Sequence, residues 1–337
     1  MQFSRLDPNR QAGQRLMIGF NGTTLDDELK YAIDTLNVGG LILFSRNIQS
    51  PDQIQELCAA AQAYTVRCGN PPLFVAIDQE GGVVARLKPP FTQFAGNPSM
   101  KYTTDARHFA HVTARELERV GVNMNMAPVL DVAPTLGPSI MAQRVFGSDP
   151  LWVAQMGTTV IEHLQAAGIM AVGKHFPGIG RTVMDSHEEL PDLDIDAQTL
   201  SQSDLIPFRA AIESGVCGIM LSHIRYGRLD ARWPASLSVT IVQDLLRATL
   251  GYDGLVLTDD LDMGAIAKHY ALPDIIRQCL YAAVDIILIC HAGPKIAAAY
   301  EQIVHHMHKS EALALKNDAC LARIQKAKAK FLDKKIP

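Results

Sequence analysis

The run Ile169-Met170-Ala171-Val172-Gly173, followed directly by Lys174-His175-Phe176-Pro177-Gly178-Ile179-Gly180, decides how the chain is interpreted. The first five residues are apolar and predict a buried strand. Titratable side chains come next, and Asp185-Ser186-His187 follows after a short interval. In α/β enzymes the chemistry lies where buried parallel strands end. The run therefore predicts a catalytic loop after a central strand, in preference to a polar surface loop with incidental histidines.

Seven other apolar or β-branched runs recur along the chain and predict further strands. The full expected set is 16–20, 39–44, 73–77, 122–126, 169–173, 217–221, 254–257 and 285–289. Helical spacing of apolar residues predicts helices at 51–67, 105–120, 149–167, 204–213, 239–250, 294–307 and 311–331. Strand-then-helix units in this number predict an α/β fold, a closed parallel (β/α)8 TIM barrel, more than an open doubly wound sheet.

Length and composition agree with one large folded unit. The chain has 337 residues, of which 48% are hydrophobic and 20% charged, and its net charge is −4. No linker or low-complexity tract divides it, so we interpret residues 1–337 as one catalytic barrel domain with C-terminal helices. No basic block indicates nucleic-acid binding, and no apolar run approaches the roughly 18 residues that a membrane helix needs.

The cysteines and the first residues predict the compartment. The six cysteines, at positions 58, 68, 217, 279, 290 and 320, have neither CxxC nor ligand-like spacing. Met1-Gln2-Phe3-Ser4-Arg5-Leu6-Asp7-Pro8 has no apolar signal-peptide core. We therefore expect free thiols in a cytoplasmic protein. Separately, we expect a monomer that binds neither membrane nor nucleic acid.

Polar side chains follow five of the expected strands, whose ends meet at one rim of a barrel. They are Asp78, Glu80, Arg86, Asp131, Arg144, Lys174, His175, Asp185, His187, His223, Asp259, Asp260 and Asp262. We expect a structural role for Asp131, and a helix cap and first-turn acid in Asp260 and Asp262. His223 is open between ligand contact and packing. Helix capping or pairing with Arg86 is the alternative role for Asp78 and Glu80.

Three classes of enzyme use side chains of these types in their active sites. A zinc hydrolase needs histidine spacing such as HxH or HExxH close to its active site, and none of the expected strand ends carries it. A lyase or aldolase would use a strand-end lysine such as Lys174 as a Schiff base. A retaining glycosidase would use a strand-end carboxylate such as Asp259 as nucleophile. Asp185 and His187 could serve as its acid–base pair, because residues i and i+2 of an extended segment project to the same side. The residues alone leave the nucleophile open among the three aspartates of 259–262.

These motifs together resemble glycoside hydrolase family 3, and within it the bacterial β-N-acetylglucosaminidases. The matching segments are Asp78-Gln79-Glu80-Gly81-Gly82 with Arg86, Asn125-Met126-Ala127-Pro128-Val129-Leu130-Asp131, Arg144-Val145-Phe146-Gly147, Lys174-His175-Phe176-Pro177-Gly178, Asp185-Ser186-His187, Pro234-Ala235-Ser236-Leu237-Ser238 and Thr258-Asp259-Asp260-Leu261. They run in family order over about residues 10–300. The chain departs from the common family pattern at Ile179 and Arg181, and in Met141-Ala142-Gln143.

The resemblance implies a retaining exo-β-N-acetylglucosaminidase that removes terminal, non-reducing N-acetylglucosamine without a metal or cofactor. It assigns Asp259 as the covalent nucleophile and His187 as the acid/base, with Asp185 as the partner of His187. Charged or hydrogen-bonding side chains would bind the sugar: Asp78, Arg86, Arg144, Lys174 and His175. Such groups suit hydrogen bonds to hydroxyls and to an acetamido oxygen. A histidine acid/base departs from the two-carboxylate scheme of most glycosidases.

The resemblance also implies a natural substrate. This would be N-acetylglucosaminyl-1,6-anhydro-N-acetylmuramic acid, with or without a stem peptide, in peptidoglycan recycling. Cell-wall biogenesis and degradation, cell shape, the cell cycle and cell division would depend on it. Many relatives carry a second domain that supplies an acidic acid/base; this chain is expected to use its own loop, which argues against a β-glucosidase. Two alternatives stay open: a phosphorylase, whose phosphate a histidine would not repel, and a barrel that binds sugar without turnover.

Overall fold

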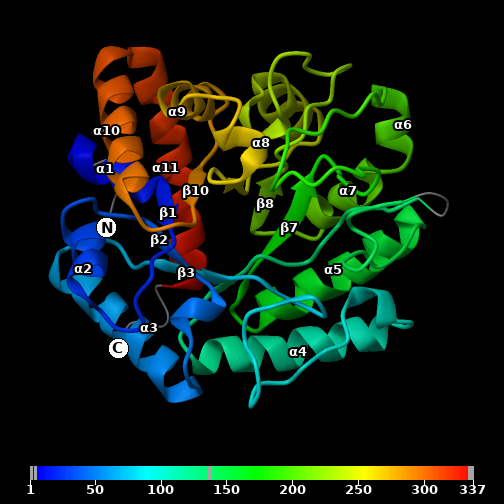
Figure 1. Cartoon of the computed structure of the whole chain (residues 1–337), viewed down its shortest axis with the longest axis horizontal. Coiled ribbons are helices and arrows are strands. Elements are labelled where there is room, and N and C mark those ends of the chain that lie inside the picture. The colour runs from blue at the N-terminus through cyan, green and yellow to red at the C-terminus, as the bar shows by residue number, and fades with distance from the viewer. Residues whose placement is uncertain (1–2, 4–5, 135–137, 333–337) are drawn as a thin grey trace.

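Alternating strands and helices build a closed barrel in the computed structural model, which describes residues 3, 6–134 and 138–332 (Figure 1). Within these residues eight parallel strands form the barrel, in the order β1-β10-β9-β8-β7-β6-β3-β2. They are β1 (Leu16–Ile18), β2 (Gly40–Leu43), β3 (Phe74–Ile77), β6 (Met124–Asn125), β7 (Met170–Phe176), β8 (Gly218–Leu221), β9 (Leu255–Asp260) and β10 (Ile286–Ile289). Each expected strand is present, so the prediction of a (β/α)8 TIM barrel is confirmed.

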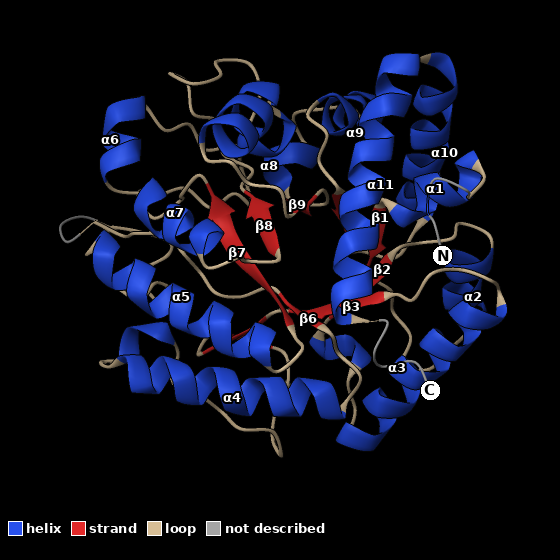
Figure 2. Ribbon diagram, turned by 180° about the vertical axis from the view of Figure 1, so that it is seen from behind, coloured by secondary structure: helices blue, strands red, loops and turns tan. Residues whose placement is uncertain are grey.

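Helices surround the strands (Figure 2). They are α1 (Pro8–Gln14), α2 (Asp27–Asp34), α3 (Pro51–Arg67), α4 (Thr103–Arg119), α5 (Pro150–Ala166), α6 (Ala197–Gln202), α7 (Leu205–Glu213), η5 (Thr240–Thr249), α8 (Gly264–Ala267), α9 (Leu272–Tyr281), α10 (Pro294–Lys309) and α11 (Glu311–Phe331). The expected helices are all present, and that at 239–250 is π-helical. Helices α1, α2, α6, α8 and α9 were not expected, because so few turns carry little periodicity.

The long connection after β3 holds a small hairpin, β4 (Gln79–Gly81) and β5 (Val84–Ala85). Short 3-10 turns complete the described elements at η2 (Ser45–Asn47), η3 (Asn97–Ser99) and η4 (Ala235–Leu237). The apolar runs predicted neither β4 nor β5, which are three and two residues long. The hairpin brings Glu80, on β4, close to the end of β3.

The strands are buried on both faces, which explains their nearly continuous apolar sequences. Successive residues of a strand point to opposite sides. On β3, Phe74 and Ala76 belong to the cluster inside the barrel, and Val75 and Ile77 to the layer between strands and helices. Methionines at 17, 124, 126, 170 and 220 also belong to the inner cluster. Their flexible side chains suit an irregular interior.

The last helix closes the end of the barrel where the strands begin. Leu321, Ile324 and Phe331 of α11 join the inner cluster. Lys328 is buried beside them, and its Nζ donates to Gln14 Oε1 at 2.8 Å. The mouth at the opposite end of the barrel remains for chemistry.

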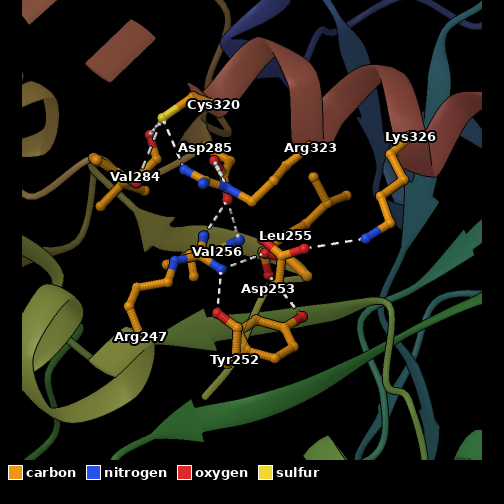
Figure 3. A network of polar contacts seen from close by, with 12 residues as sticks. Arg247, Tyr252, Asp253, Leu255, Val256, Val284, Asp285, Cys320, Arg323 and Lys326 are labelled. Atoms are coloured by element: carbon orange, nitrogen blue, oxygen red, sulfur yellow. Dashed lines mark hydrogen bonds and ion pairs between the residues drawn. The ribbon is translucent and has the colours of Figure 1, made fainter. Parts of the chain in front are cut away.

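A buried carboxylate ties α11 and η5 to the strands at this closed end (Figure 3). Asp285 Oδ1 accepts from Arg323 Nε at 2.8 Å, and Asp285 Oδ2 accepts from Arg247 Nη2 at 2.7 Å. The same Oδ2 accepts from the backbone N of Val256 at 2.7 Å. Arg15 donates its Nε to the carbonyl oxygen of Asp285 at 2.9 Å. The last helix, η5 and the segments that begin β1, β9 and β10 are thus joined by buried polar contacts.

The cysteines are free, as expected, and most of them are buried. Burial raises the pKa of the Cys58, Cys217 and Cys279 thiols to about 12. They behave as small apolar residues of low reactivity. In the described ranges no helix has the length and apolar character needed to span a bilayer.

Candidate active site

Three charged side chains continue the inward-facing rows of the barrel strands. Asp78 follows β3, Lys174 lies in β7 and Asp259 lies in β9. The residues two positions earlier, at 76, 172 and 257, all belong to the inner cluster. Because side-chain direction repeats every second residue, the three charges point into the mouth of the barrel. This is the end at which barrel enzymes place their active sites.

Five side chains at the mouth form a chain of ion pairs in which the charge alternates. Arg86 Nη2 lies 3.3 Å from Asp78 Oδ2, and Lys174 Nζ lies 2.7 Å from Asp78 Oδ1. Lys174 Nζ also lies 2.6 Å from Glu80 Oε1. Arg144 donates Nη2 to Glu80 Oε1 at 2.7 Å and Nε to Glu80 Oε2 at 3.0 Å. We call the series Arg86–Asp78–Lys174–Glu80–Arg144 the ionic chain.

Charge pairing keeps the ionic chain ionised despite its burial. Burial would raise the pKa of Asp78, but Lys174 and Arg86 hold this pKa at about 2. Burial also opposes ionisation of Glu80, but Lys174 and Arg144 lower its pKa. Burial would lower the pKa of Lys174, but Asp78 and Glu80 raise it. Near neutral pH the mouth therefore presents fixed charges of both signs, which are strong hydrogen-bonding groups for a polar ligand.

His175 extends the ionic chain to a buried carboxylate. Arg144 Nη2 lies 3.4 Å from His175 Nε2, and His175 Nδ1 lies 2.8 Å from Asp131 Oδ2. Because a guanidinium only donates, Nε2 accepts and Nδ1 carries the proton toward Asp131. Asp131 is fully buried and also accepts from the backbone N of Ile179 at 2.8 Å. These contacts fit the expected structural role of Asp131.

Asp259 presents a carboxylate with few protein partners. Among the described residues, its side chain accepts one hydrogen bond, from the backbone N of Asp260 at 2.8 Å. The buried His223 uses Nδ1 toward Ser236 Oγ at 2.7 Å and Nε2 toward the carbonyl oxygen of Asp260 at 2.9 Å. Burial lowers the pKa of His223, and the charge of Asp259 opposes this effect. Of the two roles considered for His223, its contacts favour packing, whereas Asp259 keeps lone pairs free for a ligand.

The prediction that Asp260 and Asp262 are the cap and a first-turn acid of the next helix is wrong. Helix α8 begins only at Gly264 and has no side-chain cap. Asp260 Oδ1 accepts from the backbone N of Cys290 at 3.0 Å, and Asp262 pairs with Lys295. The turn after β9 bends toward β10 before the helix starts, so both carboxylates serve to join these two segments.

One group of side chains at this rim has the spacing of metal ligands. Asp260, Asp262 and His291 offer ligand atoms within 4.8 Å of one another. The ammonium of Lys295 already binds Asp262 and would compete with a cation. His291 is exposed, and its backbone N already donates to Asp262 Oδ2 at 3.1 Å. We assign no metal to the group.

Asp185 and His187 form the pair that their spacing predicts. His187 Nδ1 lies 2.8 Å from Asp185 Oδ1, which also accepts from the backbone N of His187 at 2.9 Å. Partial burial would raise the pKa of Asp185, but these bonds to His187 lower it. The His187 side chain is 68% exposed. Its Nε2 is therefore available to exchange a proton with a ligand at the mouth.

The loop of residues 178–190, which the sequence predicts to be catalytic and which we call the catalytic loop, lies against the segment that follows Asp259. Gly264 donates its backbone N to the carbonyl oxygen of His187 at 3.0 Å, and Ala265 donates to that of Ser186 at 3.1 Å. A Cβ on Gly264 would lie 2.6 Å from the His187 oxygen, so glycine is required for this contact. The carboxylate at the end of β9 and the Asp185–His187 pair thus belong to neighbouring, hydrogen-bonded segments.

The base of the catalytic loop is closely packed. A Cβ on Gly180 would lie 2.1 Å from the carbonyl oxygen of Val132. Arg181, where the chain departs from the common family pattern, binds the buried Asp204 with an Nε–Oδ2 distance of 3.0 Å. The exposed Asp185–His187 pair therefore lies on a loop whose first residues are held in place by packing and by an ion pair.

Glu80 joins the site although it was not among the expected sugar-binding residues. Its side chain is 1% exposed and contacts two cations of the ionic chain, Lys174 and Arg144. Pairing with Arg86 was the alternative considered for Asp78 and Glu80. It accounts for only one of the two ion pairs of Asp78, because Asp78 also pairs with Lys174. The spacing of Asp78 and Glu80 could have predicted that Glu80 belongs to the site, since residues i and i+2 of an extended segment project to the same side.

Known proteins are similar to the chain over most of its length. A family model described as the glycosyl hydrolase family 3 N-terminal domain matches residues 9–327. A Beta-hexosaminidase of Nitrosomonas eutropha is 36% identical over 285 residues, which cover 82% of this chain and 80% of that protein. A Beta-hexosaminidase of Alkalilimnicola ehrlichii is 37% identical over 297 residues, which cover 86% of this chain and 84% of that protein.

Solved structures share the fold. A glycoside hydrolase family 3 β-N-acetylglucosaminidase from Paenibacillus sp. superposes with a TM-score of 0.94 and 35% identity. The match covers 98% of this chain and 64% of that one. A β-N-acetylhexosaminidase from Beutenbergia cavernae has a TM-score of 0.87 and 28% identity, and covers 96% of this chain and 99% of that one. The chain therefore spans nearly all of one such structure and 64% of the other.

Proposed function

The chain belongs to glycosyl hydrolase family 3, and from this premise we propose that it is a retaining exo-β-N-acetylglucosaminidase. One observation carries the proposal: Asp259 keeps free lone pairs at a barrel mouth that the ionic chain lines with fixed donors and acceptors. A carboxylate can attack an anomeric carbon, and the charged groups can bind hydroxyls and an acetamido oxygen. The relatives that are named Beta-hexosaminidase support this choice of sugar.

In the proposed reaction Asp259 displaces the leaving group from the anomeric carbon. The bond to the leaving oxygen breaks while His187 Nε2 transfers a proton to that oxygen. Asp185 accepts from Nδ1, so it orients the ring and leaves Nε2 to face the leaving oxygen. In the second step His187 takes a proton from water, which attacks the glycosyl-enzyme and releases Asp259. Two inversions retain the anomeric configuration.

The contacts of Lys174 argue against a Schiff-base lyase. A Schiff base requires a neutral amine. Lys174 Nζ lies between Asp78 and Glu80, and these carboxylates raise its pKa. We assign Lys174 to sugar binding together with Asp78, Arg86, Arg144 and His175.

We extend the proposal to the natural substrate and its setting. The substrate would be N-acetylglucosaminyl-1,6-anhydro-N-acetylmuramic acid, with or without a peptide, in peptidoglycan recycling. The exposed position of His187 supports a bulky leaving group, because the acid must reach an oxygen outside the pocket of the terminal sugar. Residues 1–337 would act as one barrel domain in a cytoplasmic monomer, a setting in which free thiols persist.

The test compares wild type and Asp259→Asn on an aryl N-acetylglucosaminide. We expect the variant to fold and to lose most turnover, and a fluorinated sugar to label Asp259 in the wild type. Labelling of Asp260 or Asp262 would contradict the assignment.

The aryl glucoside should react at least ~10-fold more slowly, because it leaves a buried donor unpaired. Turnover that requires phosphate would identify a phosphorylase, and sugar binding without turnover would identify a non-catalytic barrel.

A further inference from the structure

We propose that Glu80 is the positioning residue of the sugar-binding shell: it fixes Arg144 and Lys174 and does not itself touch the sugar. The inference rests on the proposed function, since it takes these two cations to bind the terminal sugar. Glu80 lies on β4, Lys174 on β7, and Arg144 in the connection between β6 and α5. One carboxylate thus connects three separate segments of the mouth.

Burial excludes Glu80 from direct contact with a ligand. Its side chain is 1% exposed, whereas that of Asp78 is 15% and that of Arg144 is 20% exposed. Both oxygens of Glu80 are already occupied, Oε1 by Lys174 and Arg144, and Oε2 by Arg144. Any influence of Glu80 on the sugar must therefore pass through these two cations.

The contacts require a carboxylate of this length. A carboxylate accepts through both oxygens, and the two donors of Arg144 use both. In Glu80→Gln an amide donor replaces one oxygen, so one contact to a cation becomes donor against donor. In Glu80→Asp the charge stays, but the side chain is one methylene shorter and cannot hold Arg144 and Lys174 together. Glu80→Gln therefore tests the charge of the side chain, and Glu80→Asp tests its length.

The charge of Glu80, together with that of Asp78, also helps to keep Lys174 protonated. Lys174 is buried and faces Asp78, Glu80 and Arg144. Without the charge of Glu80, one carboxylate would remain to oppose burial and the repulsion from Arg144. The pKa of Lys174 should then fall toward the working range of the enzyme. Loss of the Lys174 charge at alkaline pH would appear as weaker sugar binding.

The experiment measures kcat and KM for the aryl N-acetylglucosaminide and the aryl glucoside from neutral to alkaline pH. Glu80→Gln should raise KM for the N-acetylglucosaminide about 10- to 100-fold, the usual effect of losing charged hydrogen bonds, and change kcat less. Its preference for the acetamido sugar should shrink, and its kcat/KM should decline at lower pH than in wild type. Glu80→Asp should also raise KM but keep the wild-type alkaline profile.

A matched control is Asp285→Asn at the closed end of the barrel (Figure 3). Asp285 is likewise a buried carboxylate between two cations, Arg247 and Arg323. This variant should lower Tm but keep the KM, sugar preference and pH profile of wild type. Calorimetric titration with N-acetylglucosamine should show weaker binding in Glu80→Gln by about the same factor as KM.

A lower Tm in Glu80→Gln with KM and pH profile as in wild type would overturn the inference. If Glu80→Gln does not fold, an unchanged KM in Glu80→Asp would overturn it equally. Failure of the proposed function is a separate result, because wild type itself would then not turn over the N-acetylglucosaminide.

Discussion

His187 lies in solvent, whereas Lys174 and His175, two of the residues assigned to sugar binding, are enclosed. Its side chain is 68% exposed, against 2% for Lys174 and 6% for His175. An enclosed shell suits the terminal sugar, and an exposed acid suits a leaving group that extends away from the barrel. The hydrogen bond that His187 Nδ1 donates to Asp185 fixes one ring nitrogen and leaves the other for proton transfer.

If His187 is the acid, its loss should matter most where the leaving group is poor. His187→Ala should slow glycosylation by a disaccharide about 10²- to 10⁴-fold, the usual contribution of general acid catalysis. A nitrophenolate needs little protonation, so the loss should be smaller there. Deglycosylation should slow as well. Pre-steady-state rates on both substrates provide the measurement, and an equal loss on both in glycosylation would remove His187 from this role.

Charged residues directly after apolar runs predicted most of the site, because such residues at the ends of buried strands usually have a function. Their partners were harder to predict. The pairing of β7 with β8 changes register between Lys174 and Phe176, so strict alternation does not assign the neighbours of His175. Asp260 and Asp262 looked like helix caps because sequence does not show where a turn bends toward another strand.

At the scale of elements, α8 joins the two halves of the proposed catalytic machinery. It spans Gly264–Ala267, directly after the turn that follows Asp259. Four residues carry no readable period, so the sequence did not predict it. Strand β7, by contrast, extends to Phe176, beyond the expected end at residue 173, because ion pairs stabilise polar residues that interrupt the apolar pattern.

Adding one methyl group at Gly264 should displace the catalytic loop. In Gly264→Ala the new Cβ would lie 2.5 Å from the carbonyl oxygen of Glu188 and 2.6 Å from that of His187, so the loop must move. We expect a loss of up to about 10²-fold, since misplacement by ~1 Å can cost this much. Rates on good and poor leaving groups should show the same pattern as His187→Ala.

The control for this change is Gly147→Ala, where an added Cβ meets only Trp152 Cδ1, at 3.6 Å. It should retain wild-type rates. Wild-type rates in Gly264→Ala would show that the loop does not depend on its contact with α8.

At the scale of the whole molecule, the two ends of the barrel are filled differently. The mouth holds the ionic chain, and the opposite end is filled by α11, which contributes Leu321, Ile324 and Phe331 to the inner cluster. The repeated strand–helix units predicted the architecture because each unit is local in sequence. The contact between Lys328 and Gln14, 314 residues apart, has no local signature.

Lys328 should make stability depend on pH. Burial lowers its pKa from 10.5 to about 7. Below pH about 7 both folded and unfolded chains are protonated, and the folded state bears the cost of burying the charge. As pH rises from about 7 to about 10.5, the unfolded chain binds more protons than the folded one, so this group increasingly favours folding.

Lys328→Met should therefore be more stable than wild type in mild acid, and its advantage should shrink as pH rises. Urea unfolding at a series of pH values measures the difference, and activity at the distant mouth should be unchanged. An advantage that stays constant with pH would mean that the lysine is not buried as an ammonium.

The barrel can close only after its last strand has been synthesised. Strand β1 pairs with β2 on one side and β10 on the other, and Arg15 binds the carbonyl oxygen of Asp285, 270 residues later. A ribosome adds about 5–20 residues per second, so β1 waits roughly 14–54 s for its second neighbour. Throughout that interval the nascent chain has an open sheet edge, the usual starting point of intermolecular pairing. The three-residue length of β1 keeps that edge short while translation proceeds.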